Sequence, residues 1–365
     1  MAQSLILKPR EQPLFYGHEA QSNWFLESWK LNRLPHGLLL VGPSGLGKAT
    51  FAFRVARSLL GFPEVSADLH ELGLPFEHPV FRRIASGGHG DLLVIEPEAT
   101  QDGQSSKEIN VELLRSVKHF LSQTPLEGGW RVVIIDGEMN RHAANALLKV
   151  LEEPPAKTLL MILTESLGRV IPTIRSRCQK LIFGALNDQE VAKSISRMFP
   201  KVSPLDLKVI IELAEGRPGR ALQLYEAGGA DVYRELIEAL NAIHPFSLSK
   251  IHGFCQKYAA KQKKEEGMNL FVLVGELIEH WLHKVVAYHL SQEKNVISEV
   301  VQGEIHSFGQ AARIREVAEW SVVWEKVNEV FRQARQFHLD RYQILIEVFT
   351  NISSSNKELV SSARA

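Results

Sequence analysis

The residues best suited to chemistry form the glycine-rich run GPSGLGK at positions 42–48. Glycines let a backbone turn tightly and direct its N–H groups at a phosphate, and the start of a following helix adds partial positive charge. The run lies between an apolar stretch and a helical pattern, which is the context of a P-loop. We predict that a nucleotide phosphate contacts Gly42, Pro43, Ser44, Gly45, Leu46, Gly47 and Lys48. A glycine-rich turn that binds nothing is the alternative.

The side chains that would hold magnesium and activate water are incomplete. A P-loop has Ser or Thr directly after its lysine, so that the hydroxyl binds Mg²⁺, but Ala49 occupies this position. Thr50 comes one residue later, about 100° further around a helix. Asp136 follows a second apolar stretch, at the position of a metal-binding acid. Gly137 then stands where a catalytic Glu is expected, and Glu138 is displaced by one residue.

Thr164 ends another apolar stretch and has two interpretations. Its hydroxyl could reach the γ-phosphate of a nucleotide, or it could satisfy a backbone group where the strand ends. Ala49, Thr50, Asp136 and Thr164 therefore complete the set of candidate nucleotide contacts. This set leaves binding of ATP or ADP open and magnesium uncertain, and we expect no efficient hydrolysis at this site.

A second candidate is the segment TIRSRC at 173–178. Its arginines Arg175 and Arg177 form either a solvated turn or a guanidinium presented to a phosphate held by a neighbouring protein, an arginine finger. Cys178 has no recognisable general base, so we expect a small packing residue rather than a nucleophile.

These candidates lie in a region where short apolar runs alternate with helical patterns. Continuous apolar strands separated by helices predict a parallel sheet covered on both faces. The predicted strands are 37–41, 91–95, 131–135, 159–163 and 180–183, and the helices between them are 48–60, 108–121 and 140–152. The segment 61–90 is expected to be an irregular insertion that places His78 and His89 in a solvated loop.

Beyond residue 184 the pattern is helical. We predict helices at 187–198, 204–215 and 219–227, a break at the glycine pair 228–229, and further helices up to about residue 352. The predicted organisation is an α/β domain at 1–184, a small helical domain at 185–229, a larger helical domain at 230–352 and a polar tail at 353–365.

Composition excludes several classes of protein. The 365 residues carry equal numbers of acidic and basic side chains, 42 of each, so no uniformly basic nucleic-acid surface is expected. The two cysteines cannot form a disulfide framework or a four-cysteine zinc site. No apolar run approaches the roughly 18 residues of a membrane span, and we find no secretory signal. A reduced, cytoplasmic setting is the expectation.

Several segments together resemble the AAA+ clamp-loader family, the subunits that load the sliding clamp for bacterial DNA polymerase III. The resemblance covers essentially the whole chain and is densest between residues 16 and 222. It rests on YGHE at 16–19, RLPHG at 33–37, the P-loop, NALLKVLEEPP at 145–155, SRC at 176–178, GRPGRAL at 216–222 and HLDRYQ at 338–343.

The resemblance implies a RecA-like AAA+ domain, a small helical lid and a C-terminal helical collar that joins subunits into a hetero-oligomer. It implies partners as well: the ATPase subunits and the delta subunit, with the sliding clamp and primed DNA contacted through the complex, and no membrane. The Ser-Arg-Cys motif implies that Arg177 acts catalytically in trans, on the nucleotide of a neighbouring ATPase subunit.

The departures from the family pattern favour its delta-prime members, which assemble but do not hydrolyse ATP efficiently. Ala49 and Gly137 replace catalytic positions, and the sensor-2 arginine position holds Gly219, with Arg220 one residue later. The family's zinc module has no counterpart in the cysteine-free segment 61–90, so no zinc is expected. The alternative is an active AAA+ ATPase motor that uses its own P-loop.

Overall fold

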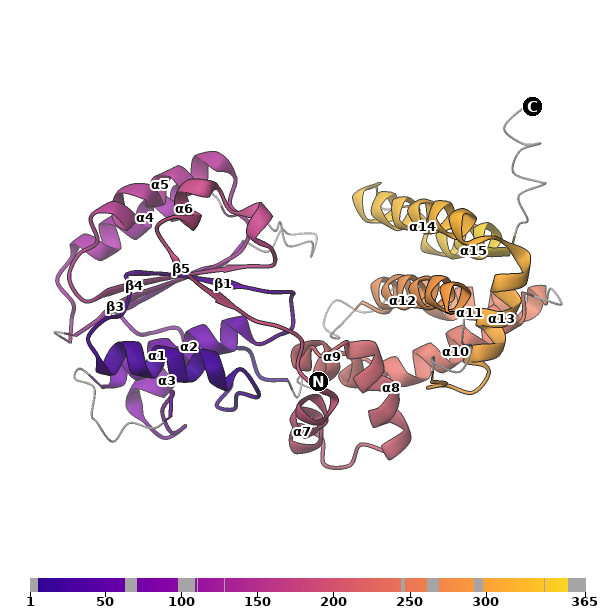
Figure 1. Cartoon of the computed structure of the whole chain (residues 1–365), viewed down its shortest axis with the longest axis horizontal. Coiled ribbons are helices and arrows are strands. Elements are labelled where there is room, and N and C mark those ends of the chain that lie inside the picture. The colour runs from indigo at the N-terminus through magenta and orange to yellow at the C-terminus, as the bar shows by residue number, and fades with distance from the viewer. Residues whose placement is uncertain are drawn as a thin grey trace. The chain divides into compact units, whose positions relative to one another are not determined.

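A computed structural model describes residues 6–62, 71–97, 109, 111–127, 129–243, 247–260, 269–291, 298–337 and 339–353. The chain divides into two compact units (Figure 1). The sheet unit contains Ile6–Ser194 together with Gly216–Arg220. The helical unit contains Ile195–Glu215 and the described residues from Ala221 onward. The predicted boundaries at 184 and 229, which define three domains, remain predictions.

The sheet unit is built on five parallel strands among its described residues, in the order β2-β3-β4-β1-β5. Val41 pairs with both Thr164 and Ile182, and Asp136 pairs with Leu163, so the carboxyl ends of β1, β3 and β4 meet at one edge. Ligands of open parallel sheets bind at this edge. The strands are β1 (Gly37–Val41), β2 (Leu92–Ile95), β3 (Arg131–Asp136), β4 (Thr158–Thr164) and β5 (Gln179–Ile182).

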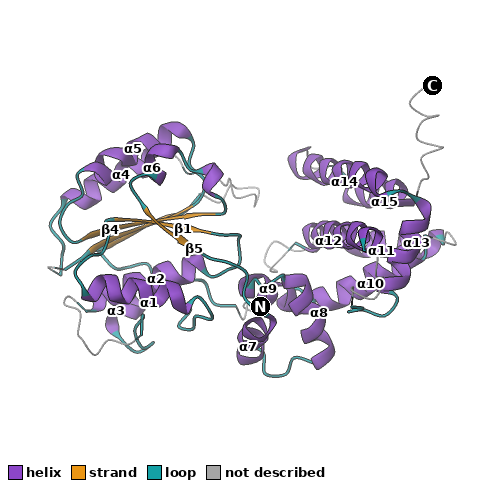
Figure 2. Cartoon of the chain, viewed as in Figure 1, coloured by secondary structure: helices purple, strands orange, loops and turns teal. Residues whose placement is uncertain are grey.

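Helices cover both faces of this sheet, as the continuous apolar strands predicted (Figures 1 and 2). One face carries α1 (Glu19–Lys30), α2 (Lys48–Gly61) and α3 (Pro79–Ala85). The other carries α4 (Val111–Ser122), α5 (Arg141–Glu152) and α6 (Pro172–Arg175), and the short 3-10 helix η1 (Leu167–Arg169) follows β4. The α/β part of the predicted fold class is therefore confirmed.

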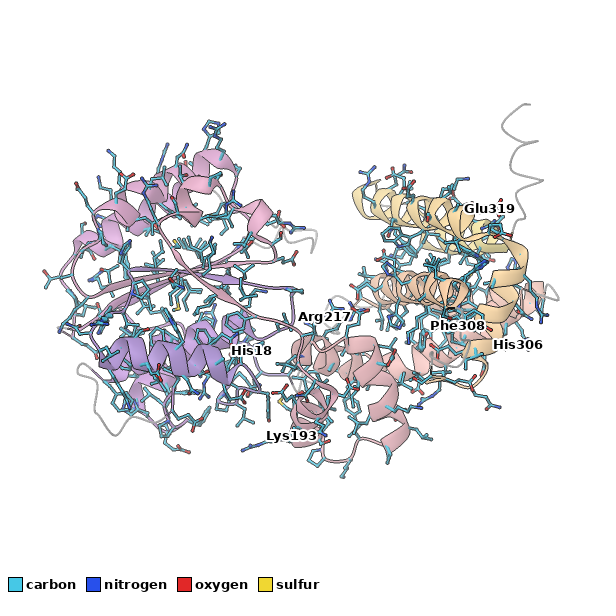
Figure 3. All side chains as sticks on the ribbon, viewed as in Figure 1. His18, Lys193, Arg217, His306, Phe308 and Glu319 are labelled. Atoms are coloured by element: carbon cyan, nitrogen blue, oxygen red, sulfur yellow. The ribbon has the colours of Figure 1, made fainter. Side chains whose placement is uncertain are left out.

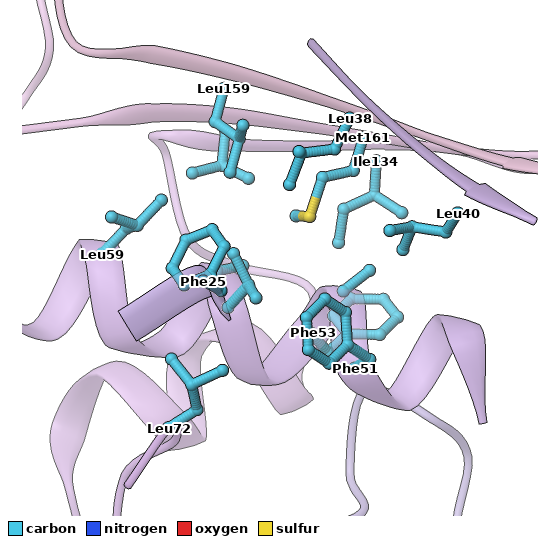
Figure 4. Packing of buried hydrophobic residues seen from close by; sticks show 14 of the residues in the cluster. Phe25, Leu38, Leu40, Phe51, Phe53, Leu59, Leu72, Ile134, Leu159 and Met161 are labelled. Atoms are coloured by element: carbon cyan, nitrogen blue, oxygen red, sulfur yellow. The ribbon is translucent and has the colours of Figure 1, made fainter. Parts of the chain in front are cut away.

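Alternation along each strand divides the apolar side chains between two cores. Leu38 and Leu40 of β1 pack toward α1 and α2, beside Phe51 (Figure 4). Leu39 and Val41 belong to the opposite cluster, with the buried residues of α4 and α5. Side chains of a strand point alternately to its two faces, so one run of apolar residues fills both cores.

Local signals set the ends of α5 close to the predicted positions. Asn140 is the N-cap, and its side chain accepts a hydrogen bond from the backbone N–H of Ala143 at 2.9 Å. The helix therefore begins at Arg141, one residue after the predicted start. Pro154 and Pro155 follow its end at Glu152 as expected.

The segment between α2 and β2 differs from its prediction. Part of it forms α3, capped by the side chain of His78, whose Nδ1 accepts from Val80 N at 3.2 Å. The Arg57 guanidinium lies 3.9 Å from the centre of the Phe81 ring and fixes this helix to α2. His89 is only 5% exposed, so the expectation of a solvated loop was wrong for this residue. The segments 63–70 and 101–107 contain no described residue.

From residue 188 onward the described elements are helices, which confirms the all-α part of the fold class. Buried polar contacts stabilise the helical unit: Trp281 Nε1 donates to Ser307 Oγ at 2.9 Å, and Tyr233 donates to the buried Glu304 carboxylate at 2.6 Å. The helices are α7 (Asp188–Met198), α8 (Pro204–Ala214), α9 (Pro218–Glu226), α10 (Gly229–Asn241), α11 (Leu248–Ala259), α12 (Leu270–Leu290), α13 (Glu304–Ile314), α14 (Val317–Phe337) and α15 (Arg341–Ser353). None of the helices found in the described residues is long and apolar enough to cross a membrane.

Candidate functional site

The P-loop connects β1 to α2, as its sequence context predicted. Gly42, Gly45 and Gly47 have φ angles of 155°, 86° and 88°, a region that side chains rarely adopt. A Cβ on Gly42 would also lie 2.3 Å from the carbonyl oxygen of Phe183. Glycine is therefore required here for the loop to curve between the strand and the helix.

The ammonium group of Lys48 lies on the carbonyl oxygens of its own loop. Its Nζ donates to Gly42 O at 2.5 Å and to Pro43 O at 2.8 Å. Burial lowers the pKa of Lys48, while the nearby carboxylates of Asp136 and Glu165 oppose that shift. A phosphate that used this lysine would have to replace the two carbonyl oxygens as acceptors.

The first turn of α9 packs directly on the P-loop, and both segments belong to the sheet unit. Gly219 N donates to Gly45 O at 2.8 Å. A Cβ on Gly219 would lie 2.9 Å from that same oxygen, so a side chain does not fit between the two backbones. This close approach explains why a glycine stands at position 219.

A histidine supports the P-loop from the other side and was missed as a functional candidate. His18, the N-cap of α1 (Figure 3), has its Nε2 3.1 Å from Leu46 O. Its ring lies 4.8 Å from that of Phe183 and 6.0 Å from that of Phe15, and burial lowers its pKa. The signal in the sequence was the segment 16–19. It contributed to the family resemblance, but it gave no role to the histidine.

A cavity of about 310 Å³ lies between the P-loop and the carboxyl ends of β3 and β4. Its lining brings together Ser44, Lys48, Asp136 and Thr164, four of the predicted nucleotide contacts. The charged lining residues are mostly acidic: Glu96, Asp136, Glu138 and Glu165 face Lys48 and Arg169. Burial and the neighbouring Glu96 raise the pKa of Asp136, while Lys48 opposes the shift. The cavity thus has an anionic wall beside the phosphate-binding loop.

The missing acid has a steric explanation. A Cβ on Gly137 would lie 2.8 Å from Pro97 Cγ and 2.9 Å from Ile109 Cγ1, so these side chains occupy the space of a catalytic Glu. Glu138, the displaced acid, pairs with Arg169, which also contacts Glu165 at 2.9 Å. Its carboxylate is therefore committed to an ion pair at the rim of the cavity.

The two residues that follow Lys48 do not complete a metal site. Ala49 packs against the apolar cluster under α2, and neither Ala49 nor Thr50 is among the described residues that line the cavity. Thr164 Oγ1 donates to Ser166 O at 3.0 Å, the local role that was its alternative interpretation. Neither Ala49 nor Thr50 therefore adds a hydroxyl ligand beside the Asp136 carboxylate, which lines the cavity.

The finger candidate Arg177 lies at the opposite edge of the sheet. Leu38 pairs with Gln179, so Arg177 comes before the start of β5, level with the start of β1. The P-loop follows the other end of β1, a strand of 5 residues, which at about 3.3 Å per residue is roughly 16 Å long. Arg177 therefore lies at the edge of the sheet opposite the one that carries the cavity of its own chain.

The guanidinium of Arg177 has partners on two elements. Nη2 donates to Glu152 Oε1 at 2.8 Å, and Nη1 donates to Thr173 O at 3.1 Å. Cys178 is buried against Gly37, and burial raises its pKa to about 11. Its side chain belongs to the apolar cluster of β1 and α5, as expected of a packing residue.

Residues 17–187 match the family model described as DNA polymerase III, delta subunit. Over these residues the chain is similar to that family. The match contains the P-loop, the cavity and Arg177, so every predicted site residue lies within it.

Curated relatives show a similarity to subunits of the same polymerase. The chain is 31% identical to DNA polymerase III subunit delta' of Pseudomonas aeruginosa, over 57% of this chain and 61% of that protein. It is 31% identical to subunit delta' of Bacillus subtilis, over 60% and 64%. Subunit gamma of Buchnera aphidicola is 28% identical, over 57% and 54%. The matches thus span between half and two thirds of the relatives' own length.

Solved structures with a similar arrangement include a DNA polymerase III gamma subunit-related protein from Thermotoga maritima, at 17% identity and a TM-score of 0.38, covering 90% of this chain and 98% of that one. Another is the DNA clamp loader delta protein of Bacillus subtilis, at 13% identity and a TM-score of 0.34, covering 91% and 99%.

Proposed function

We propose that the chain is a clamp-loader subunit of DNA polymerase III that works in the cytoplasm as part of a hetero-oligomer. Its partners are the ATPase subunits and the delta subunit, and it reaches the sliding clamp and primed DNA through the complex. Helices from residue 230 to 352 form its assembly collar. The relatives named delta' and gamma support this role, because both are DNA polymerase III subunits.

The proposed catalytic contribution is Arg177 acting in trans. The observation that carries it is the position of Arg177 at the sheet edge away from its own P-loop, with 35% of its side chain exposed. An arginine there is presented to a neighbour and not to its own cavity. A guanidinium on the transferring phosphoryl group stabilises negative charge that develops in the transition state.

The chain's own site is proposed to hydrolyse ATP weakly or not at all. Pro97 and Ile109 fill the space of the catalytic acid, Glu138 pairs with Arg169, and Thr50 is not among the described residues that line the cavity. The ligand class that the loop suits is ATP or ADP, held passively through Lys48 and the loop N–H groups. An active motor would need a general base in this cavity, and the displaced acid Glu138 is already paired with Arg169.

The test is the DNA- and clamp-stimulated ATPase rate of the reconstituted complex. Arg177→Ala should lower the rate with assembly intact, by as much as about 10³-fold at a site that depends on this finger. Arg175→Ala is the matched control, two residues away in the same segment. An unchanged rate with Arg177→Ala would contradict the proposal, as would magnesium-dependent turnover by the isolated chain that Lys48→Ala abolishes.

A further inference from the structure

The ion pair between Glu152 and Arg177 connects the end of α5 to the segment that carries the proposed finger. We propose that Glu152 is a positioning residue for Arg177: it orients the guanidinium toward the neighbouring subunit's nucleotide and remains in contact when the phosphate binds. This inference rests on the proposed function, because it concerns how the same arginine is held.

The backbones on both sides of the pair are held by packing. Leu151, next to Glu152, is 2% exposed, and Ile174 of α6 is fully buried. Cys178, next to Arg177, is buried against the first residue of β1. Packing therefore leaves mainly the side-chain torsions of the pair to adjust. An arginine side chain has many rotamers, so a fixed acceptor nearby reduces the number that must be ordered when the phosphate binds.

The guanidinium of Arg177 retains N–H donors that can bind a phosphate. A guanidinium has five N–H donors. Glu152 Oε1 takes one from Nη2, and Thr173 O and Ser176 Oγ accept from Nη1 at 3.1 Å and 3.5 Å. These acceptors define the plane of the group, while the remaining donors, on Nε and Nη2, can bind a phosphate. Glu152 and a phosphate can thus be bound together.

The exposure of the pair indicates that Glu152 orients Arg177 and does not act as a lock that holds Arg177 away from the phosphate. The side chains are 35% and 48% exposed, so solvent screens their attraction and the pair is easily rearranged. A lock would compete with the incoming phosphate, and its removal would raise activity. An orienting partner has the opposite effect, because its removal lowers the rate of the chemical step while substrate binding is unchanged.

The experiment measures stimulated ATPase activity of the reconstituted complex. Glu152→Ala should lower kcat about twofold to fivefold, the range expected of an exposed ion pair, with KM for ATP unchanged. Glu152→Gln keeps an oxygen acceptor at the same place and should restore most of the rate. Glu153→Ala, at the adjacent exposed residue, is the matched control and should equal wild type.

A double mutant tests whether Glu152 acts through Arg177. In an Arg177→Ala background, Glu152→Ala should cause no further loss, because the two residues act as one unit. Additive losses, an unchanged rate with Glu152→Ala, or a faster rate with either Glu152 variant would overturn the inference while the finger role stands. If Arg177→Ala itself leaves the rate unchanged, the proposed function fails first.

Discussion

Substitution of Gly137 tests why the chain lacks a catalytic acid. The φ angle of Gly137 is not in the positive, left-handed range. An alanine can therefore adopt this backbone conformation without strain. The added Cβ would instead lie 2.8 Å from Pro97 Cγ and 2.9 Å and 3.0 Å from two carbons of Ile109. The Pro97 ring cannot rotate away as a flexible side chain would. Gly137→Ala should therefore destabilise the protein through overpacking alone.

The expected magnitude follows from these contacts. Overpacking by one methyl group costs about 1–3 kcal/mol. In a unit of roughly 150–250 residues each kcal/mol shifts Tm by about 2–4 °C, so a central value of about 2 kcal/mol lowers Tm by about 4–8 °C. Gly137→Glu should be at least as destabilising and should produce no ATPase activity.

The assay is thermal unfolding followed by circular dichroism, with Gly184→Ala as the matched control. A Cβ on Gly184 meets nothing within 4 Å, so this variant should keep the wild-type Tm or exceed it, since alanine restricts the unfolded chain. If Gly137→Ala were as stable as Gly184→Ala, the space beside Asp136 would be open and the steric explanation for the missing acid would be wrong.

Three further predictions concern buried groups. Cys178 should resist iodoacetamide at pH 8 in the folded protein and react only after unfolding, because it is buried and its pKa is about 11; rapid labelling would contradict its packing role. Burial lowers the pKa of His18, so the unfolded state binds more protons near its ordinary pKa of about 6.5, and stability should fall as the pH drops from 7 toward 5. Urea titrations at both pH values should show a smaller fall for His18→Gln, and an equal fall would exclude His18 as a source. Tyr233→Phe removes the O–H donor of the buried Glu304 carboxylate and should lower the free energy of unfolding by about 1–3 kcal/mol, measured in urea; a neutral change would mean that another group satisfies the carboxylate.

The sequence determined the elements whose signals are local. The P-loop residues 42–48 specify a tight turn between a strand and a helix, because glycines allow the positive φ angles that the turn needs. Asn140 and the prolines after Glu153 delimit α5 within one residue of the prediction. Apolar runs of strand length predicted β1, β3 and β4, since a strand buried on both faces must be apolar almost throughout.

Only the tertiary structure decided which residues meet across long separations in the chain. Gly219 contacts Gly45, Pro97 and Ile109 fill the space beside Gly137, and Glu152 pairs with Arg177. His89 was predicted to be solvated and is buried. Such contacts depend on strand register and on side-chain packing between distant segments, whereas local spacing depends on the backbone of a few neighbouring residues. The same register separates Arg177 from its own P-loop by the length of β1, a fact that no motif in the sequence contains.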